Sequence, residues 1–507
     1  MYLILTIACV FVIYFLFFRK NYFAKLGIPY KTPFPLLGNM WKVIFRKSTG
    51  VDVITEVYNC NSEAKYVGIF EFTVPVLMIK DLELIKDITV KHFDHFVDHR
   101  TVMDPEREAL IGSNLFSLHG EQWRKVRALL SPAFTSSKMK GMFVLMSEYA
   151  RTFSDYLVNQ SRKGSIDFNS KDIFTRYTND VIATCAFGVS VDSMANSEND
   201  FYVFGKKGTS FDGIKGLKFF LSNSFPWLAK IFRVKVIERR RNDVRDVETF
   251  FYDLVRETIK TRNERGIYRP NMIQLMMETR GNDPGSKNPE LSIESMTSQA
   301  FIFFFGGFDS TSTTMCFAAH EIAVNPKVQK RLQEEIDQVL NENNGDPSYE
   351  AINGMQYLDA VISETLRKYP IQVAANRICT KSFELPPALP GLQPLVMKPG
   401  DSLWIPTWAI HRSDQHFPDP EMFDPERFMD KDSINHSAYM PFGICPRMCI
   451  GNRFALLEMK VMFFHVLAKC SIKISDKMIM PMRLSKTSLT LIAEGGFWLE
   501  IHPRVIV

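Results

Sequence analysis

The stretch PFGICPRMCIG, residues Pro441 to Gly451, constrains this chain most, because it puts a cysteine where a Gly- and Pro-rich loop turns into a helix. The run NRFALLEMKVMFFHVLAK that follows without a break predicts that helix. Free N–H groups and the positive end of the helix dipole should therefore point at the sulfur of Cys449, which favours a thiolate. Gly451 has no side chain to block a large flat ligand, and Arg447 offers a fixed cation beside it. A metal held by one thiolate, with a wide planar partner, suggests haem iron.

Two other interpretations of this cysteine remain open at the level of the residues. An isolated cysteine at a helix terminus is often a small, buried apolar side chain without any chemistry. A zinc site that used Cys445 and Cys449 would need two further ligands from elsewhere in the chain.

The motif FGxxPRxCIGxRFA resembles the haem-binding loop of the cytochrome P-450 monooxygenases, which hold their axial cysteine where Cys449 stands. The resemblance implies a haem b cofactor, iron protoporphyrin IX, with Cys449 as its thiolate ligand and Phe442, Arg447 and Gly451 as cofactor-binding residues. The family usually has a glycine where this chain has Cys445. If the backbone is left-handed there, a residue other than glycine costs about 1–2 kcal/mol.

The longest apolar segment, MTSQAFIFFFGGFDSTSTTMCFAAHEIAVNP, predicts a helix that carries Gly306 and Gly307 in its middle. Each glycine costs about 1 kcal/mol in such a position, and a pair of them opens a groove where a small ligand can approach the backbone. Asp309 and Ser310 then place a carboxylate and a hydroxyl beside the groove, as proton delivery to a bound oxygen requires. The alternative is a tight helix crossing, with Ser310 bonded back to its own backbone. In the family, a threonine usually stands at the position of Ser310.

Several residues that match cofactor-binding positions of the family lie far from the cysteine loop in the sequence. Trp123 and Arg127 are four residues apart and so share one helix face, which alone predicts no more than a stacked surface pair. The resemblance implies that they bond a haem propionate, and that Arg377 in AANRICT does the same. His411 falls where the family has a polar contact, although an ordinary turn histidine explains it equally well.

The segment YLDAVISETLRKYP places Glu364 and Arg367 on the same helical face. An exposed pair at this spacing contributes only about 0.2–0.5 kcal/mol. The family's ExxR pair is instead buried and joined by the arginine of a downstream PERF, which is Arg427 in FDPERF here. The resemblance therefore gives these three residues a structural role beside the cofactor.

The first residues, MYLILTIACVFVIYFLFF, are apolar and are followed by Arg19 and Lys20. Because no basic segment precedes them and no small-residue cleavage site follows, we expect an uncleaved membrane anchor rather than a signal peptide, with a partly buried helix as the alternative. Flanking cations should stay on the cytoplasmic side, so the rest of the chain should face the cytosol. The resemblance to microsomal members of the family implies the endoplasmic reticulum membrane. In the cytosol the eight cysteines should be reduced. Residues 211–237 suit a loop that dips into the membrane surface, or else a core helix broken at Pro226.

No linker or internal repeat divides the 507 residues, so we predict one large domain. The expected organisation is an anchor at 1–20, a proline-rich hinge at 21–40 and a haem-thiolate catalytic domain at 41–507. The expected fold class is mainly α with small β-sheets, the cytochrome P-450 fold. A hairpin is predicted from Tyr66 to Lys80, a surface loop at 279–292, and two strands turned at Gly495-Gly496 near the C-terminus.

The formal charge of +5 is mild, and no basic run is interleaved with aromatics, so nucleic acid is not an expected partner. The cations Arg124, Lys125, Lys138 and Lys140 predict a basic surface on which an acidic redox protein could dock, though a solvated face is an equal alternative. The chain has no GxGxxG and no P-loop, so electrons must come from outside. The resemblance implies NADPH–cytochrome reductase as their source, with cytochrome b5 as a further candidate.

The resemblance implies insertion of one atom of O2 into a hydrophobic small molecule, since a thiolate ligand favours O–O cleavage. The substrate class stays open between xenobiotic, hormone, fatty acid and odorant. Two alternatives remain, a haem-thiolate isomerase or dehydratase and a non-catalytic membrane-bound lipophile binder. The predicted substrate pocket consists of Phe116, Phe301, Phe304, Phe305, Phe308 and Val373.

Overall fold

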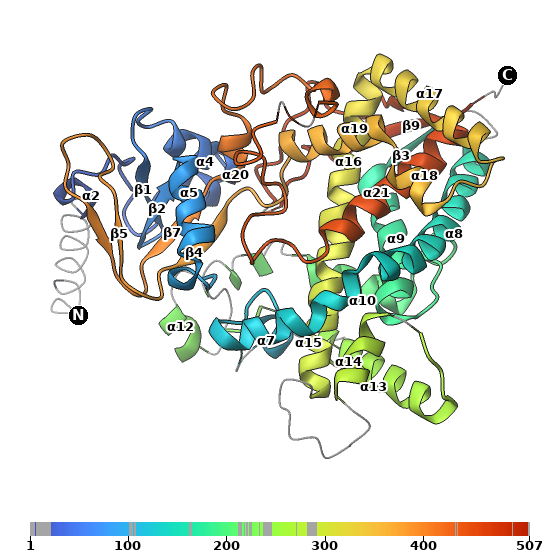
Figure 1. Cartoon of the computed structure of the whole chain (residues 1–507), viewed down its shortest axis with the longest axis horizontal. Helices are drawn as coiled ribbons and strands as arrows, with labels where there is room; N and C mark the ends of the chain where they lie inside the picture. Colours follow the sequence, from blue (N-terminus) through green and yellow to red (C-terminus); the bar gives the residue numbers. More distant parts are fainter. Residues whose placement is uncertain are drawn as a thin grey trace.

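The computed structural model describes residues 22–100, 108–161, 165–210, 226–232, 234–236, 246–269, 271–280, 292–430, 434–488 and 490–504, with a few isolated positions between them. Most of these residues are helical, and three small sheets accompany the helices. Figure 1 shows the helices gathered on one side of the molecule and the largest sheet on the other. The predicted class, mainly α with small β-sheets, is therefore confirmed.

The largest sheet has the strand order β1-β2-β7-β4. β1 (Tyr66–Glu71) and β2 (Val74–Ile79) form the antiparallel hairpin that the sequence predicts. β2 runs parallel to β7 (Ser402–Ile405), which pairs antiparallel with β4 (Ala375–Ile378). β5 (Phe383–Leu385) and β6 (Leu395–Met397) make a separate ribbon.

The third sheet corrects the expectation for the C-terminus. Gly495 and Gly496 both have positive φ, 77° and 93°, so the chain does turn there. However, β9 (Trp498–Pro503) pairs with β3 (Ile166–Asn169) and β8 (Cys470–Ile474) instead of with the residues just before the turn. The preceding segment contributes only an isolated bridge between Leu484 and Ala493. Pairing with two strands buries Leu499 and Ile501, which a lone hairpin would leave half exposed.

Two long helices lie at the centre. α15 (Ile293–Phe305) continues through a π-helical turn, η6 (Gly306–Ser310), into α16 (Thr311–Val324), and the three form the yellow rod that runs from top to bottom of Figure 1. α21 (Asn452–Lys469) is the helix predicted after the cysteine loop. Its side chains are buried on nearly every side, which is typical of a helix enclosed by others.

The remaining helices surround this pair or pack on the large sheet. They are α2 (Tyr22–Lys25), α3 (Trp41–Ile44), α4 (Gly50–Tyr58), α5 (Leu82–Lys86), α6 (Ala109–Gly112), α7 (Gly120–Leu130), α8 (Ser136–Ser161), α9 (Ser170–Ile182), α10 (Asp200–Thr209), α12 (Pro226–Ile231), α13 (Val247–Arg265), α14 (Met272–Arg280), α17 (Pro326–Glu342), α18 (Tyr349–Asn353), α19 (Gln356–Lys368) and α20 (Thr407–His411). Short π turns are η1 (Asp87–Lys91) and η4 (Ala183–Phe187), and 3-10 turns are η2 (Phe93–His95), η3 (Ser131–Phe134) and η7 (Pro425–Phe428).

The described part of the hinge is fixed to the large sheet. Tyr30 bridges Gly68, and Gly38 bridges Glu71, so this extended segment lies along β1. The predicted anchor at 1–20 lies outside the described residues apart from Thr6, as do most of the surface loop at 279–292 and parts of 211–237. Within the described part of the chain, no helix has both the length and the apolarity that crossing a membrane requires.

Candidate active site

A cavity of about 520 Å³ lies where α7, α9, the α15–α16 helix and the loop before α21 meet. Its wall is largely apolar, with a few polar and basic groups. The side chains that line it include His99, Phe116, Trp123, Arg127, Phe134, Met142, Ile182, Cys185, Ile302, Phe303, Phe305, Ser310, Thr311, Thr314, Ile371, Gln372, Phe442, Arg447, Cys449, Phe454 and Met459. A mostly apolar cavity with a small set of polar groups is the usual form of a small-molecule or cofactor site.

The loop presents Cys449 to this cavity. The Cys449 N–H donates to the Phe442 carbonyl over 2.9 Å and closes the loop, and α21 begins three residues later at Asn452. Cys449 is surrounded by protein atoms, and the surface that it leaves accessible faces the cavity. The sequence therefore predicted correctly that this sulfur stands at the start of the helix.

The setting at the start of the helix favours the thiolate, as the sequence predicts, but burial outweighs it. Burial among the surrounding atoms raises the pKa of the thiol above its ordinary value, and this is the largest effect. The Gly451 N–H and the Arg127 guanidinium oppose the rise but do not reverse it. A metal cation would reverse it, since a coordinating thiol is deprotonated outright.

Cys445 adopts a left-handed backbone with a φ of 72°, so the strain expected for a residue other than glycine is present. Its sulfur lies outside the cavity wall and accepts a hydrogen bond from Nη2 of Arg377 over 3.2 Å. Among the residues that the structure describes, no three His, Cys, Asp or Glu side chains converge as metal ligands. The zinc alternative therefore finds no further ligands there.

One edge of the cavity is basic. The Arg447 guanidinium lies 4.1 Å from the ring centroid of Trp123, and it donates to the carbonyls of Val97 (2.8 Å) and Leu118 (2.7 Å). Burial lowers the pKa of Arg447 to about 9. Arg127 also lines the wall. An anionic group of a ligand would find its counter-charges at this edge.

Arg377 does not line the cavity but lies directly behind it. Its Nη1 is 3.2 Å from Nδ1 of His99, a cavity residue stacked on Phe116. His99 was not among the predicted site residues, because nothing in FVDHR distinguishes a cavity histidine from a surface one.

The two glycines of the central helix have different roles. A Cβ on Gly306 would enter open space, so this residue keeps the cavity clear, whereas a Cβ on Gly307 would lie 3.0 Å from Cδ1 of Ile182. Gly307 therefore permits close packing of the helix against α9. Ser310 lines the cavity, and its hydroxyl also donates to the Gly306 carbonyl over 2.5 Å, as the alternative interpretation expected.

Asp309 is not part of the cavity wall. Its Oδ1 lies 2.9 Å from Nζ of Lys171 on α9, and the same ammonium reaches the hydroxyls of Ser312 (2.8 Å) and Thr313 (2.6 Å). Lys171 and Asp309 are both largely buried. The predicted acid and alcohol are thus neighbours in sequence, but only the alcohol faces the cavity.

The predicted ion-pair trio is assembled. Arg367 Nε and Nη2 bind the two carboxylate oxygens of Glu364 at 2.6 and 2.8 Å, and both side chains are fully buried. Arg427 Nε lies 3.6 Å from the same carboxylate. Arg367 also donates to the carbonyls of His411 (2.9 Å) and Pro420 (2.8 Å), so α19 is tied to the segment that leads into the cysteine loop.

His411 completes this connection. Its Nδ1 lies 3.1 Å from the Arg367 carbonyl, and its Nε2 accepts the N–H of Met440, the residue before the loop, over 2.9 Å. An acceptor nitrogen fixes the neutral form, with the proton on Nδ1. Burial lowers the pKa of His411 to about 3.

Acid should therefore destabilise the protein through His411. Between pH 6.5 and 3 the unfolded chain binds a proton that the folded chain does not, so this residue's contribution to the free energy of unfolding rises with pH. From pH 6.5 to 5 the expected loss is about 2 kcal/mol. Denaturant unfolding of wild type and His411→Asn at several pH values should show a shallower acid slope in the variant. Parallel curves would contradict the assignment.

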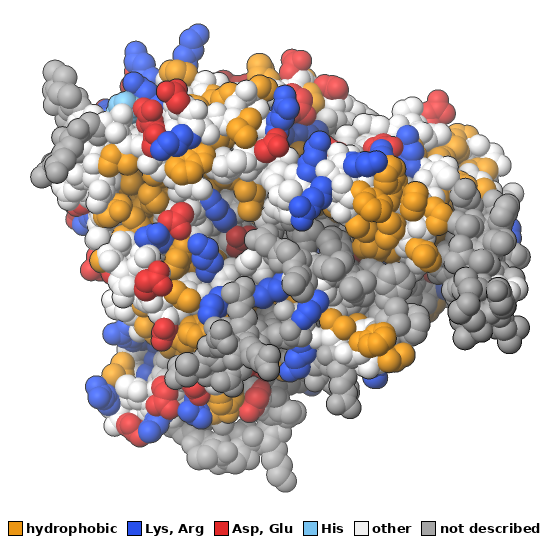
Figure 2. Space-filling model, turned by 180° about the vertical axis from the view of Figure 1, so that it is seen from behind, with side chains coloured by type: hydrophobic (Ala, Val, Ile, Leu, Met, Phe, Trp, Pro, Cys, Tyr) orange, Lys and Arg blue, Asp and Glu red, His pale blue; other side chains and the backbone are white. Residues whose placement is uncertain are grey.

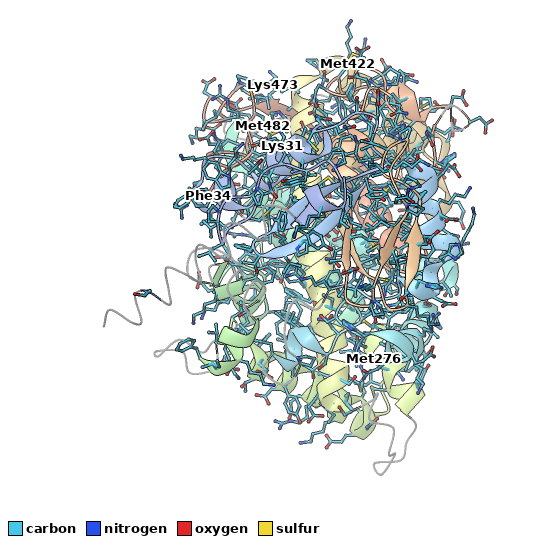
Figure 3. All side chains as sticks on the ribbon, turned by 90° about the vertical axis from the view of Figure 1, so that its left-hand side faces the viewer. Lys31, Phe34, Met276, Met422, Lys473 and Met482 are labelled. Atoms are coloured by element: carbon cyan, nitrogen blue, oxygen red, sulfur yellow. The ribbon has the colours of Figure 1, made fainter. Side chains whose placement is uncertain are left out.

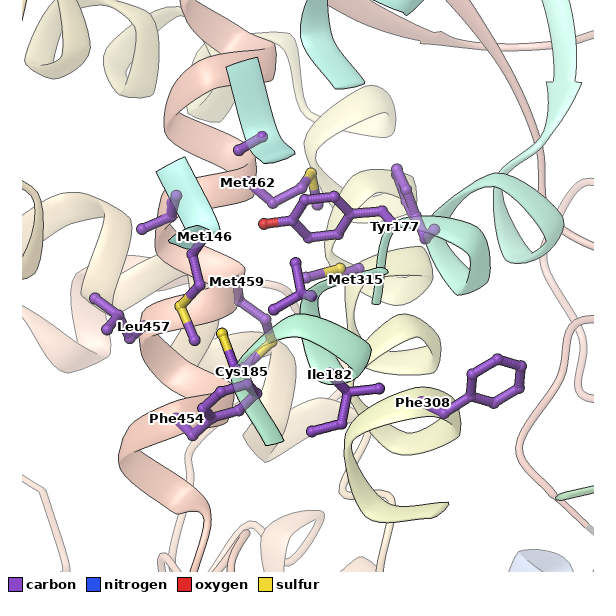
Figure 4. Packing of buried hydrophobic residues seen from close by; sticks show 14 of the residues in the cluster. Met146, Tyr177, Ile182, Cys185, Phe308, Met315, Phe454, Leu457, Met459 and Met462 are labelled. Carbon is purple, nitrogen blue, oxygen red and sulfur yellow. The ribbon is translucent and has the colours of Figure 1, made fainter. Parts of the chain in front are cut away.

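The predicted substrate pocket is correct in part. Phe116 and Phe305 line the cavity, whereas Val373 does not, and its neighbours Ile371 and Gln372 do. Phe301, Phe304 and Phe308 are buried outside the cavity, in an aromatic cluster with Phe187, Phe201 and Phe251. Figure 4 shows Phe308 pointing away from Cys185 and Phe454, which both line the cavity.

Helix periodicity explains the difference. Phe301, Phe304 and Phe308 follow the spacing of one helical face, while Phe303, Gly306, Ser310 and Thr314 follow that of another. Only the second face lies on the cavity. Phe303 could therefore have been predicted to line the cavity, because it lies on the same helical face as Gly306 and Ser310.

Comparisons with known proteins agree along the whole chain. The family model described as Cytochrome P450 matches residues 28–499. Cytochrome P450 9e2 of Blattella germanica is 42% identical over 514 residues, which cover 96% of this chain and 94% of that protein. Probable cytochrome P450 9f2 of Drosophila melanogaster is 40% identical, with 96% of each chain covered. Cytochrome P450 6j1 of Blattella germanica is 32% identical, with 95% and 93% covered.

Proposed function

Because the chain belongs to the cytochrome P450 family of haem-thiolate monooxygenases, we propose that it oxidises a lipophilic small molecule with electrons from NADPH through a separate flavoprotein reductase. The observation that carries the proposal is that Cys449 and Ser310 face one apolar cavity from opposite elements, the loop before α21 and the central helix. The substrate would be a xenobiotic or another apolar compound, since the polar groups of the wall are few.

The residues around the cavity fit haem. The sulfur of Cys449 would hold the iron, and the basic edge would bind the haem carboxylates. Gly306 and Gly451 place no side chain in the cavity beside the sulfur, and Phe442 lines it. Arg127 and Arg447 form that edge in the wall, with Trp123 stacked on Arg447, and Arg377 supports it from behind. When bound, haem supplies the activation of dioxygen.

The protein's own part is to deliver protons and exclude water. Ser310 is the hydroxyl placed to move a proton in the cavity, and its bond to Gly306 fixes its rotamer. Asp309 would reach it only if its carboxylate leaves Lys171 or acts through water.

Replacing Ser310 with alanine should divert electrons from product to peroxide, because proton delivery becomes slower while oxygen still binds. We expect product per NADPH to fall several-fold. The measurement is simultaneous assay of NADPH, product and hydrogen peroxide in a system reconstituted with reductase. Ser310→Thr is the matched control and should couple at least as well as wild type. Full coupling in Ser310→Ala would reject the role, and turnover without any reductase would reject the electron path.

We also propose that residues 1–20 anchor the chain in the endoplasmic reticulum membrane, ahead of the hinge at 21–40 and the catalytic domain at 41–507. Large apolar side chains close to this end of the chain are exposed, namely Phe34 at 46%, Leu36 at 44% and Phe45 at 57%. Figure 3 shows Phe34 at the periphery, and Figure 2 shows further hydrophobic side chains grouped on the surface. Exposed apolar groups of this kind support contact with a lipid surface.

The electron donor would be NADPH–cytochrome reductase, with cytochrome b5 as a second candidate. The basic surface predicted for it is partly neutralised within the chain. Arg124 pairs with Asp94, and Lys140 pairs with Glu350. Docking would therefore depend less on these two cations than their number in the sequence suggests.

A further inference from the structure

Cys445 occupies a position that disfavours every residue except glycine. Its φ is 72°, while the other left-handed position of the loop, at a φ of 76°, is Gly443. A side chain at 445 therefore costs conformational energy that glycine would avoid. The sulfur of this side chain accepts a hydrogen bond from Arg377.

The hydrogen bonds of Arg377 can be accounted for individually. Nη1 donates to the Asn376 carbonyl over 2.7 Å, and Nη2 donates to the Cys445 sulfur over 3.2 Å. Nε is buried without a partner, in a side chain only 2% exposed. A guanidinium carries five N–H donors. With the second N–H of Nη1 placed against Nδ1 of His99 at 3.2 Å, Nε–H and one N–H of Nη2 remain. Nε–H and an adjacent Nη2 N–H together form the edge that a carboxylate takes as a bidentate partner.

The neighbourhood makes a fixed position for Arg377 necessary. Arg447 lies close enough for the two cations to repel each other, and His99 lies against Nη1. The hydrogen bond to the sulfur at Nη2 opposes the turn away from Arg447 that this repulsion favours. A sulfur atom is large and polarisable, and it can accept a hydrogen bond without adding a full charge.

We propose that Cys445 is a positioning residue, whose sulfur orients Arg377, behind His99 and Arg447, toward the carboxylate end of the bound haem. The inference rests on the proposed function, because it takes the basic edge of the cavity to be the carboxylate end of that site. Cys445 thus acts through Arg377 and does not itself ligate the metal.

The test compares three substitutions that separate sulfur from backbone strain. Cys445→Ala keeps the strain and removes the acceptor, Cys445→Ser keeps both strain and an acceptor, and Cys445→Gly removes both. The readout is the rate at which holoprotein loses haem to excess apo-globin. Cys445→Ala should lose haem roughly two- to tenfold faster than wild type, the range expected for one lost hydrogen bond. Cys445→Ser should restore a rate close to that of wild type.

Arg377→Ala provides the coupling control. In that background, adding Cys445→Ala should not accelerate haem loss further, because the oriented group is already absent. Equal rates for wild type and Cys445→Ala, or full additivity with Arg377→Ala, would overturn the inference. Rescue by Cys445→Gly but not by Cys445→Ser would assign the effect to strain and would overturn it as well. The proposed function is tested separately by the reduced carbon monoxide spectrum, which should keep its thiolate band in all Cys445 variants. Absence of that band in wild type would contradict both.

Discussion

Replacing Cys449 with alanine should yield a folded protein that retains little haem and shows no red-shifted band in its reduced carbon monoxide complex. The reason is that, of the two cysteines in the loop, Cys449 is the one that lines the cavity, together with Arg127 and Gly451. A thiolate pushes electron density onto iron, and that red-shifted absorption depends on it. The measurements are the haem-to-protein ratio after size-exclusion chromatography and the absorption spectrum of the reduced complex.

Cys445→Ala is the matched control, since it removes the neighbouring sulfur of the same loop. It should retain the red-shifted band, although it should lose haem faster. An unchanged spectrum in Cys449→Ala would reject the ligand assignment. Loss of the band in Cys445→Ala alone would identify the other sulfur as the ligand.

Replacing Arg367 with alanine should cost about 3–5 kcal/mol of folding free energy, because the buried Glu364 carboxylate loses its bidentate partner. Arg427, 3.6 Å away, then remains beside it. A cost of this size is a large share of the roughly 5–15 kcal/mol that stabilises a typical protein. The variant also loses the bonds to the carbonyls of His411 and Pro420. We expect a protein that accumulates poorly and unfolds at much lower denaturant concentration than wild type.

Arg151→Ala is the control for this change. Arg151 pairs with Asp346 at the surface, where the two side chains are 49% and 80% exposed, so its loss should stay within about 0.5 kcal/mol. The double variant Glu364→Leu/Arg367→Met should be more stable than Arg367→Ala, because it removes the fully buried carboxylate together with its partner. If the free energy of unfolding of Arg367→Ala lay within about 1 kcal/mol of that of wild type, as for an ordinary surface substitution, the structural role would be contradicted.

Short motifs predicted the parts of the site that local structure determines. The loop around Cys449 and the ExxR helix each lie within a few residues of sequence, and their spacing fixes which side chains share a face. Arg427 was added by resemblance, and the structure brings it to within 3.6 Å of Glu364. These features could be read from the sequence because they need no knowledge of distant packing.

Contacts between distant segments could not be read in this way. Lys171, which binds Asp309, stands 138 residues before it and lies in a helix that no motif marks. Likewise β9 pairs with β3, a strand more than three hundred residues earlier. The apolar segment around Phe301 and Phe305 predicted an apolar pocket but not which face of the helix lines it. Aromatic residues occupy both sides of that helix.

The account depends most on the bond between the Cys449 sulfur and iron, and X-ray absorption at the iron edge of the purified ferric protein tests it directly. We predict one sulfur neighbour of iron in addition to the ring nitrogens in wild type, and its loss in Cys449→Ala. A wild-type spectrum that requires only nitrogen and oxygen neighbours would contradict the account.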